Sequence, residues 1–123
     1  MSKWGSIVNL SRSGEHVANT RWCSSFLCRL RGLTFRRSLE QGEGLLLVEG
    51  SESRANTAIH MWMVFFPITA AWLDKDFRIV DLRLAKPWRV YIPSAPAKYV
   101  LEGAAEMMTR ISLGDQLEWR DDE

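Results

Sequence analysis

The apolar residues of this 123-residue chain occur in short runs, and polar turns, glycine or proline interrupt each of them. Most runs are too short for a stable helix, and many contain the β-branched and aromatic residues that favour strands. Two such runs on either side of Asp74–Phe77 predict a hairpin. We expect strands over Ile7–Leu10, around Val17, and over Leu45–Val48, Thr57–Trp62, Ile68–Leu73, Arg78–Leu84, Val90–Ile92, Tyr99–Leu101 and Gln116–Trp119.

Two further segments have the apolar spacing of helices. Ser24 is suited to begin a helix, and the spacing of Phe26, Leu27 and Leu30 predicts one over Ser24–Leu33. Small and apolar residues predict a second helix over Gly103–Ser112. The length fits one domain, residues 1–123. Short strands, tight turns and two helices together predict an α+β fold, β-rich, with a curved or barrel-like, mostly antiparallel sheet.

The cysteines and the hydrophobic segments bear on location. Cys23 and Cys28 would lie on different sides of the expected helix, so we expect two reduced thiols. The first residues lack the pattern of a signal peptide. The longest uncharged apolar stretch, Met61–Leu73, is too short to span a bilayer and contains Pro67. We therefore predict a soluble, cytoplasmic protein without a membrane span.

Six short motifs in a fixed order resemble one known family. They are Arg31–Arg36 (RGLTFR), Glu43–Leu47 (EGLLL), Ile59–Met61 followed by Phe66–Ile68, Trp72–Asp76, Lys86–Arg89 and Ala97–Glu102. Together they resemble the bacterial and archaeal family of domain of unknown function 192 (DUF192), over about residues 17–119. The resemblance implies a compact β-rich α+β domain with no established activity. Many relatives are exported, but we do not carry that location over to this chain.

The chain departs from the family pattern at two positions. The family's acidic residue after the Phe-Pro-Ile motif is Thr69 here, and its glycine in the hairpin turn is Phe77. If the acid were catalytic in relatives, this protein would lack it. If the glycine serves a positive φ, we expect this turn to adopt another type.

Several classes of site find no support in the sequence. The two histidines and two cysteines lack the spacing of metal ligands, so we expect no metal. Phosphate-loop and dinucleotide motifs are missing, and we expect no cofactor. The net charge of +1 argues against nucleic acid as a partner. RNA contact through the basic segment Arg29–Arg37 is kept as a weaker alternative.

One group of polar and aromatic residues could share a concave surface. His60 and Trp62 alternate onto one face of an expected strand, Asp81 interrupts an apolar strand, and Trp88 and Arg89 follow in a loop. Flat rings with a few orienting polar groups are typical of binding sites. We therefore predict a non-catalytic module that binds a small molecule, peptide or protein. The alternative is a small hydrolase that uses His60 with Asp81 or another carboxylate.

Overall fold

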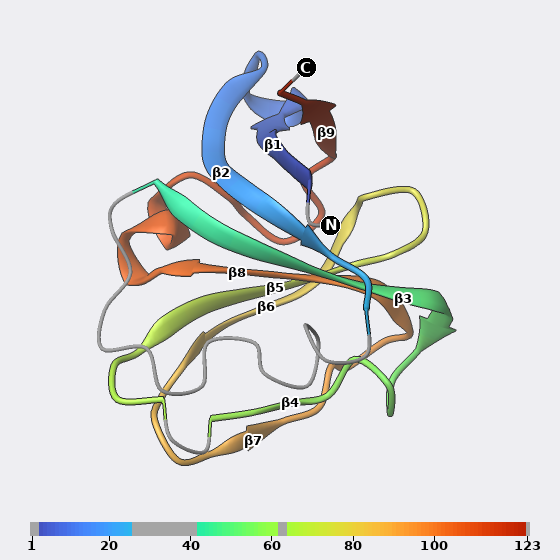
Figure 1. Cartoon of the computed structure of the whole chain (residues 1–123), viewed down its shortest axis with the longest axis vertical. Helices are drawn as coiled ribbons and strands as arrows, with labels where there is room; N and C mark the ends of the chain where they lie inside the picture. The colour runs from blue at the N-terminus through green and yellow to red at the C-terminus, as the bar shows by residue number, and fades with distance from the viewer. Residues whose placement is uncertain (1–2, 26–41, 62–63, 123) are drawn as a thin grey trace.

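The computed structural model describes residues 3–25, 42–61 and 64–122 and consists mainly of β-strands (Figure 1). The two short helices within these residues are of the 3₁₀ type and are called η. In chain order the elements are β1 (Lys3–Asn9), η1 (Leu10–Arg12), β2 (Glu15–Cys23), β3 (Glu43–Ser53), β4 (Ile59–His60), β5 (Ile68–Leu73), β6 (Ile79–Ala85), β7 (Val90–Tyr91), β8 (Ala97–Ala104), η2 (Ala105–Thr109) and β9 (Leu117–Asp121).

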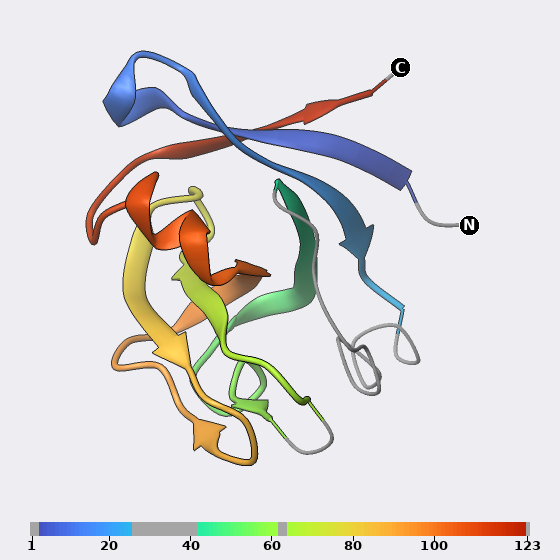
Figure 2. The same ribbon diagram turned by 90° about the vertical axis from the view of Figure 1, so that its left-hand side faces the viewer.

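Seven strands form one sheet in the order β6-β5-β8-β3-β2-β1-β9, and β4 pairs with β7 in a separate ribbon. Neighbouring strands are antiparallel except β2 and β3, which are parallel. The sheet curves so that β1, β2 and β9 lie above β5, β6 and η2 (Figure 2). It does not close into a barrel, because in the described part its edge strands meet in only one isolated bridge, Arg78 with Gln116.

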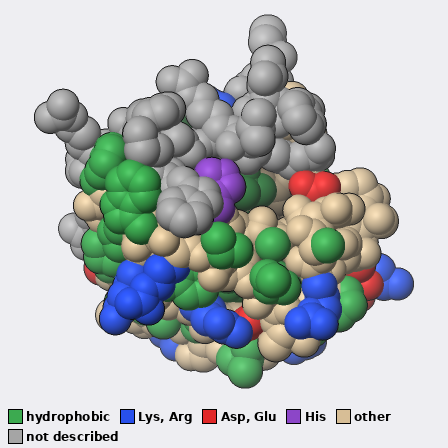
Figure 3. Space-filling model, turned by 90° about the horizontal axis from the view of Figure 1, so that it is seen from below, with side chains coloured by type: hydrophobic (Ala, Val, Ile, Leu, Met, Phe, Trp, Pro, Cys, Tyr) green, Lys and Arg blue, Asp and Glu red, His purple; other side chains and the backbone are tan. Residues whose placement is uncertain are grey.

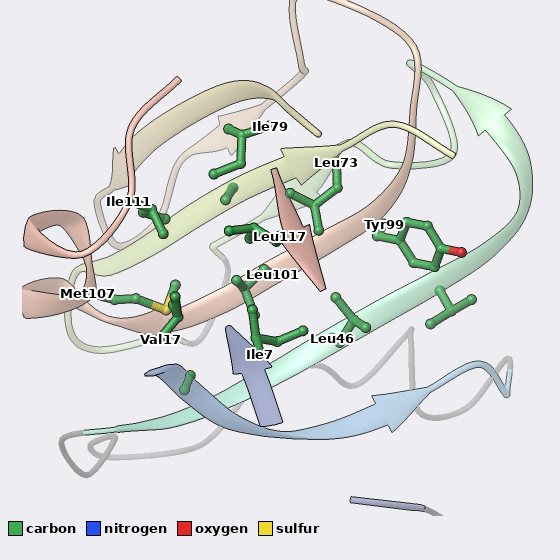
Figure 4. Close-up of a cluster of buried hydrophobic side chains, with 13 residues drawn as sticks. Ile7, Val17, Leu46, Leu73, Ile79, Tyr99, Leu101, Met107, Ile111 and Leu117 are labelled. Carbon is green, nitrogen blue, oxygen red and sulfur yellow. The ribbon is translucent and has the colours of Figure 1, made fainter. Parts of the chain in front are cut away.

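Alternation along the strands gives the sheet two buried faces. Leu46 and Leu101 point into a first core, which Ile7 and Val17 from β1 and β2 cover (Figure 4). Leu45, Leu47, Trp72 and Val100 point the opposite way into a second core, completed by Ile59 and Met61 at the β4–β7 ribbon. Because a core covers each face of β5, all six of its residues are buried. The ribbon is therefore held on the sheet by hydrophobic packing.

The expected α+β class with two helices is wrong. In place of a helix over Gly103–Ser112, β8 continues to Ala104 and only the five residues of η2 are helical. Gly103 pairs with Gly44 of β3 and Thr69 of β5, so the first residues of the expected helix belong to the sheet instead. What remains is too short to be a stable helix on its own. Residues 26–33 of the other expected helix lie outside the described residues, and Ser24 and Ser25 are not helical.

The expected strands are found close to their predicted places, and β5 has the predicted bounds. The hairpin of β5 and β6 is also confirmed. A bulge at Trp72/Leu73 shifts the register, so Asp81 pairs with Trp72 and Ile79 with Leu73. Val80 therefore packs on the second core rather than with Leu82, which packs on the first.

The two departures from the family pattern are accommodated locally. The Thr69 hydroxyl is buried and donates to the carbonyl oxygens of Ala104 (2.8 Å) and Ala105 (3.1 Å), where η2 begins. Phe77 has φ +65°, so the expectation that the turn would abandon the positive φ is wrong. Its ring packs 4.3 Å from that of Tyr99, and this contact offsets the cost of a left-handed conformation, about 1–2 kcal/mol.

The expectation of two reduced thiols is also wrong. Cys23 is fully buried at the end of β2 and is disulfide-bonded. The prediction assumed helical geometry through residue 23, where the chain is extended. Among the described residues, no helix is long and apolar enough to cross a membrane. The cytoplasmic location stays a prediction.

Candidate functional site

The β4–β7 ribbon brings together three of the predicted site residues. His60 pairs with Val90, and the Met61 amide donates to the Arg89 carbonyl (2.7 Å). The Trp88 amide in turn donates to the Met61 carbonyl (2.8 Å). His60, Trp88 and Arg89 therefore lie on adjacent stretches of backbone, although some thirty residues separate them in the chain. Trp62 lies outside the described residues.

Large apolar side chains are exposed on this ribbon. Phe65 is 52% exposed, Val90 55% and Ile92 53%. Trp88 is 47% exposed and meets the Phe65 ring edge-on, with 6.0 Å between ring centroids. The face seen in Figure 3 carries several hydrophobic side chains, with Lys and Arg side chains along its lower side and Asp or Glu side chains toward its right. Large apolar side chains exposed together on one face of a small protein are typical of an interaction surface.

Trp88 is held in a strained conformation in the turn between β6 and β7. Its φ is +66°, a region that bulky residues rarely adopt. The ring of this strained residue is about half exposed and does not pack in the core. Strained residues with exposed side chains concentrate at functional sites, so this turn is a candidate contact point.

The ribbon is also free of acidic residues. The segments 53–73 and 82–101, which contain β4, β7 and their flanking turns, include no Asp or Glu. They do include Arg54, Lys86 and Arg89, all exposed, together with the exposed His60. In a chain with 15 acidic residues, this makes the ribbon a cationic as well as apolar surface.

Asp81 lies at the margin of the ribbon, on β6, where backbone groups engage its carboxylate. It accepts from the amides of Leu82 (2.8 Å) and Ser94 (2.9 Å) and lies 3.4 Å from the Arg83 guanidinium. Burial raises the pKa of Asp81, but the hydrogen bonds from Ser94 and Leu82 and the Arg83 charge outweigh it, so the pKa is lowered. Asp81 thus fastens the loop after β7 to β6.

Asp81→Ala is expected to lower the free energy of unfolding by about 1–3 kcal/mol, because two amides lose their partner. Since the folded pKa is lowered, this contribution is complete above the ordinary value of 3.8 and is lost as the pH falls through the folded pKa. Urea denaturation at pH 7 and pH 3 measures both effects. A difference between the proteins that grows on acidification would contradict this role.

Glu102 is a buried acid that sequence reasoning did not single out. On β8 it pairs with Leu45 and Ala70 of the neighbouring strands, and it is only 5% exposed. Burial raises its pKa to about 7. No hydrogen bond of the described residues reaches its side chain. One signal was available: Glu102 is the only charged residue between Lys98 and Glu106.

Two other classes of site are a metal centre and an RNA contact. Within residues 3–25, 42–61 and 64–122, no group of three His, Cys, Asp or Glu side chains could hold a metal ion. The whole basic segment Arg29–Arg37 falls outside these ranges, so RNA contact through it stays a prediction.

Comparison with known proteins decides the family. The profile of DUF192, described as "Uncharacterized ACR", matches residues 8–119. The chain belongs to the DUF192 family. A UPF0127 protein of Pyrococcus horikoshii is 35% identical over 115 residues, covering 92% of this chain and 97% of the relative. A UPF0127 protein of Thermococcus kodakarensis is 32% identical, covering 92% of this chain and 72% of the relative.

Two solved structures share the fold of this DUF192 protein. One is a putative transcription regulator from Sinorhizobium meliloti, with TM-score 0.82 and 22% identity, covering 97% of this chain and 94% of that one. The other is a protein of unknown function from Novosphingobium aromaticivorans, with TM-score 0.75 and 18% identity, covering 94% and 84%. At these identities the likeness establishes the fold alone.

Proposed function

We propose that this DUF192 protein is a non-catalytic binding module whose contact surface is the β4–β7 ribbon. The observation that carries the proposal is the cluster of Phe65, Trp88, Val90 and Ile92, each about half exposed, beside His60 and Arg89. Aromatic and arginine side chains contribute most to binding at interfaces. Because these side chains point outward, a partner with an extended surface fits them better than an enclosed small molecule.

The hydrolase alternative receives less support. That hypothesis needs a carboxylate beside the His60 ring, to orient it as in a catalytic triad. The Asp81 oxygens are occupied by two amides and Arg83, and no hydrogen bond of the described residues involves the His60 ring. In this proposal His60 and Arg89 orient the partner, while Asp81 positions the loop that carries Ile92.

Trp88→Ala is expected to abolish the rise in melting temperature caused by any ligand of this surface, since a ligand that prefers the folded state stabilises it. A thermal-shift screen of metabolites, metals and short peptides supplies such ligands. Trp4→Ala is the matched control, because Trp4 is 48% exposed, against 47% for Trp88, but lies on β1, which is in the upper part of Figure 1, whereas β4 and β7 are at the bottom.

Trp88→Gly provides a second variant that removes the ring and also relieves the positive φ, so it is expected to fold at least as well as Trp88→Ala. If ligand shifts persist in both Trp88 variants, or if Trp4→Ala alone removes them, the binding surface lies elsewhere and the proposal fails.

A further inference from the structure

The exposed apolar side chains of the ribbon lie at one extreme end of the molecule. In both Figure 1 and Figure 2 the turn between β6 and β7, which contains Trp88, is the lowest part of the molecule. Phe65 comes from the segment after β4, and Val90 and Ile92 come from β7 and the residue that follows it. Two separate pieces of chain, the segment with Phe65 and the stretch 88–92, therefore present large apolar side chains at the same tip.

Basic residues lie close to these apolar side chains. Arg54, Lys86 and Arg89 are exposed on or beside the tip, and the segments 53–73 and 82–101 that contain it include no Asp or Glu. At the opposite end, β9 carries both signs of charge, with the exposed Asp121 and Asp122 next to the exposed Arg120 (Figure 1). The basic residues would orient the tip toward a negatively charged partner.

We propose that this tip docks on the surface of an anionic lipid membrane, with Trp88 and Phe65 entering the interfacial layer and Lys86, Arg89 and Arg54 contacting the headgroups. The inference rests on the proposed binding function and names its partner. Tryptophan is enriched at membrane interfaces, and clustered basic residues attract anionic lipid. The apolar residues project from two separate segments, and a fluid lipid interface accommodates such side chains without a preformed pocket.

An acidic protein or peptide is the competing occupant. It would satisfy the same charges, but it would also need a pocket for each of four side chains that project from two separate segments. A bilayer makes no such demand, and binding through shallow insertion needs no membrane-spanning segment. The lipid surface is therefore the occupant that these observations favour.

Flotation with vesicles tests the proposal. The probe is vesicles of phosphatidylcholine and phosphatidylserine at 7:3, compared with pure phosphatidylcholine, in 50 mM and 500 mM NaCl. We expect the native protein to float with the mixed vesicles at low salt, and high salt or the omission of phosphatidylserine to release it. Trp88→Ala and Trp88→Gly should each reduce binding at least about tenfold, whereas Trp4→Ala should bind as the native protein does.

A charge-matched pair tests the basic residues separately. Lys86→Ser combined with Arg89→Ser should weaken binding at least about tenfold. The control, Lys75→Ser combined with Arg120→Ser, removes the same charge from exposed positions outside the ribbon and should leave binding unchanged. Circular dichroism of every variant verifies that the fold is retained.

Each contrary outcome has a distinct meaning. A native protein that stays unbound with mixed vesicles at low salt overturns the lipid assignment, as does equal binding to pure phosphatidylcholine. If a peptide then shifts the melting temperature in a manner dependent on Trp88, the occupant is a peptide and the binding function stands. If vesicles bind equally well to both Trp88 variants and to the charge variant, neither proposal holds at this surface.

Discussion

Glu102→Gln is expected to raise the free energy of unfolding at pH 8 by as much as about 3 kcal/mol. The pKa of Glu102 rises from an ordinary 4.5 to about 7 because burial penalises the charged carboxylate. A tenfold change in proton affinity between the unfolded and folded states corresponds to about 1.4 kcal/mol. Since the folded state holds the proton more tightly, the native protein loses stability as the pH rises from 4.5 through 7. The amide does not titrate and escapes this loss.

Urea unfolding of both proteins at pH 5 and pH 8 measures this effect. The gain from Glu102→Gln should be large at pH 8 and much smaller at pH 5. Glu15→Gln is the control, because Glu15 is exposed at the start of β2 and its replacement should change little at either pH. An equal effect of Glu102→Gln at both pH values would mean that Glu102 does not keep its proton through burial.

Trp72→Ala is expected to cost about 3–5 kcal/mol of folding stability, the range for deleting a large buried ring. Trp72 is fully buried in the second core, and its indole N–H donates to the Thr57 carbonyl at 2.7 Å. The substitution removes both the ring and the donor. Because Thr57 lies two residues before β4, the β4–β7 ribbon should also lose its anchor.

Chemical denaturation gives the stability, and amide hydrogen exchange at Met61 and Trp88 reports on the ribbon. Trp72→Phe keeps most of the apolar volume but not the donor, so it should be less destabilising than Trp72→Ala. Trp4→Ala serves again as the exposed counterpart. A loss below about 1 kcal/mol for Trp72→Ala would contradict the role of Trp72 as a core residue.

The strands were predictable because their signal is local. The run Ile68–Leu73 and the polar turn after it contain the information for a strand and a hairpin within about ten residues. Gly103–Ser112 looked helical for equally local reasons, but strands β3 and β5, distant in the chain, recruit its first residues into the sheet. Here tertiary pairing overrides local propensity.

The same distinction applies to the candidate site. Strand alternation placed His60 beside Trp62, and a short connection placed Trp88 and Arg89 near Asp81. The approach of His60 to Trp88 and Arg89 depends instead on the pairing of β4 with β7, which are distant in the chain. Glu102 could not be found in that way. Its burial depends on the order β5-β8-β3 within the sheet, which pairs it with Ala70 on one side and Leu45 on the other. That order is a property of the whole chain.

The pairing of β1 with β9 has a consequence for synthesis on the ribosome. β1 ends at Asn9, but its outer neighbour is Leu117–Asp121, which follows about a hundred residues later in the chain. One edge of β1 therefore stays open until Leu117–Asp121 have left the ribosome, and the first core lacks Leu117 for as long. An unpaired strand edge invites association with other chains. The nascent protein is accordingly exposed to misassembly until β9 is released.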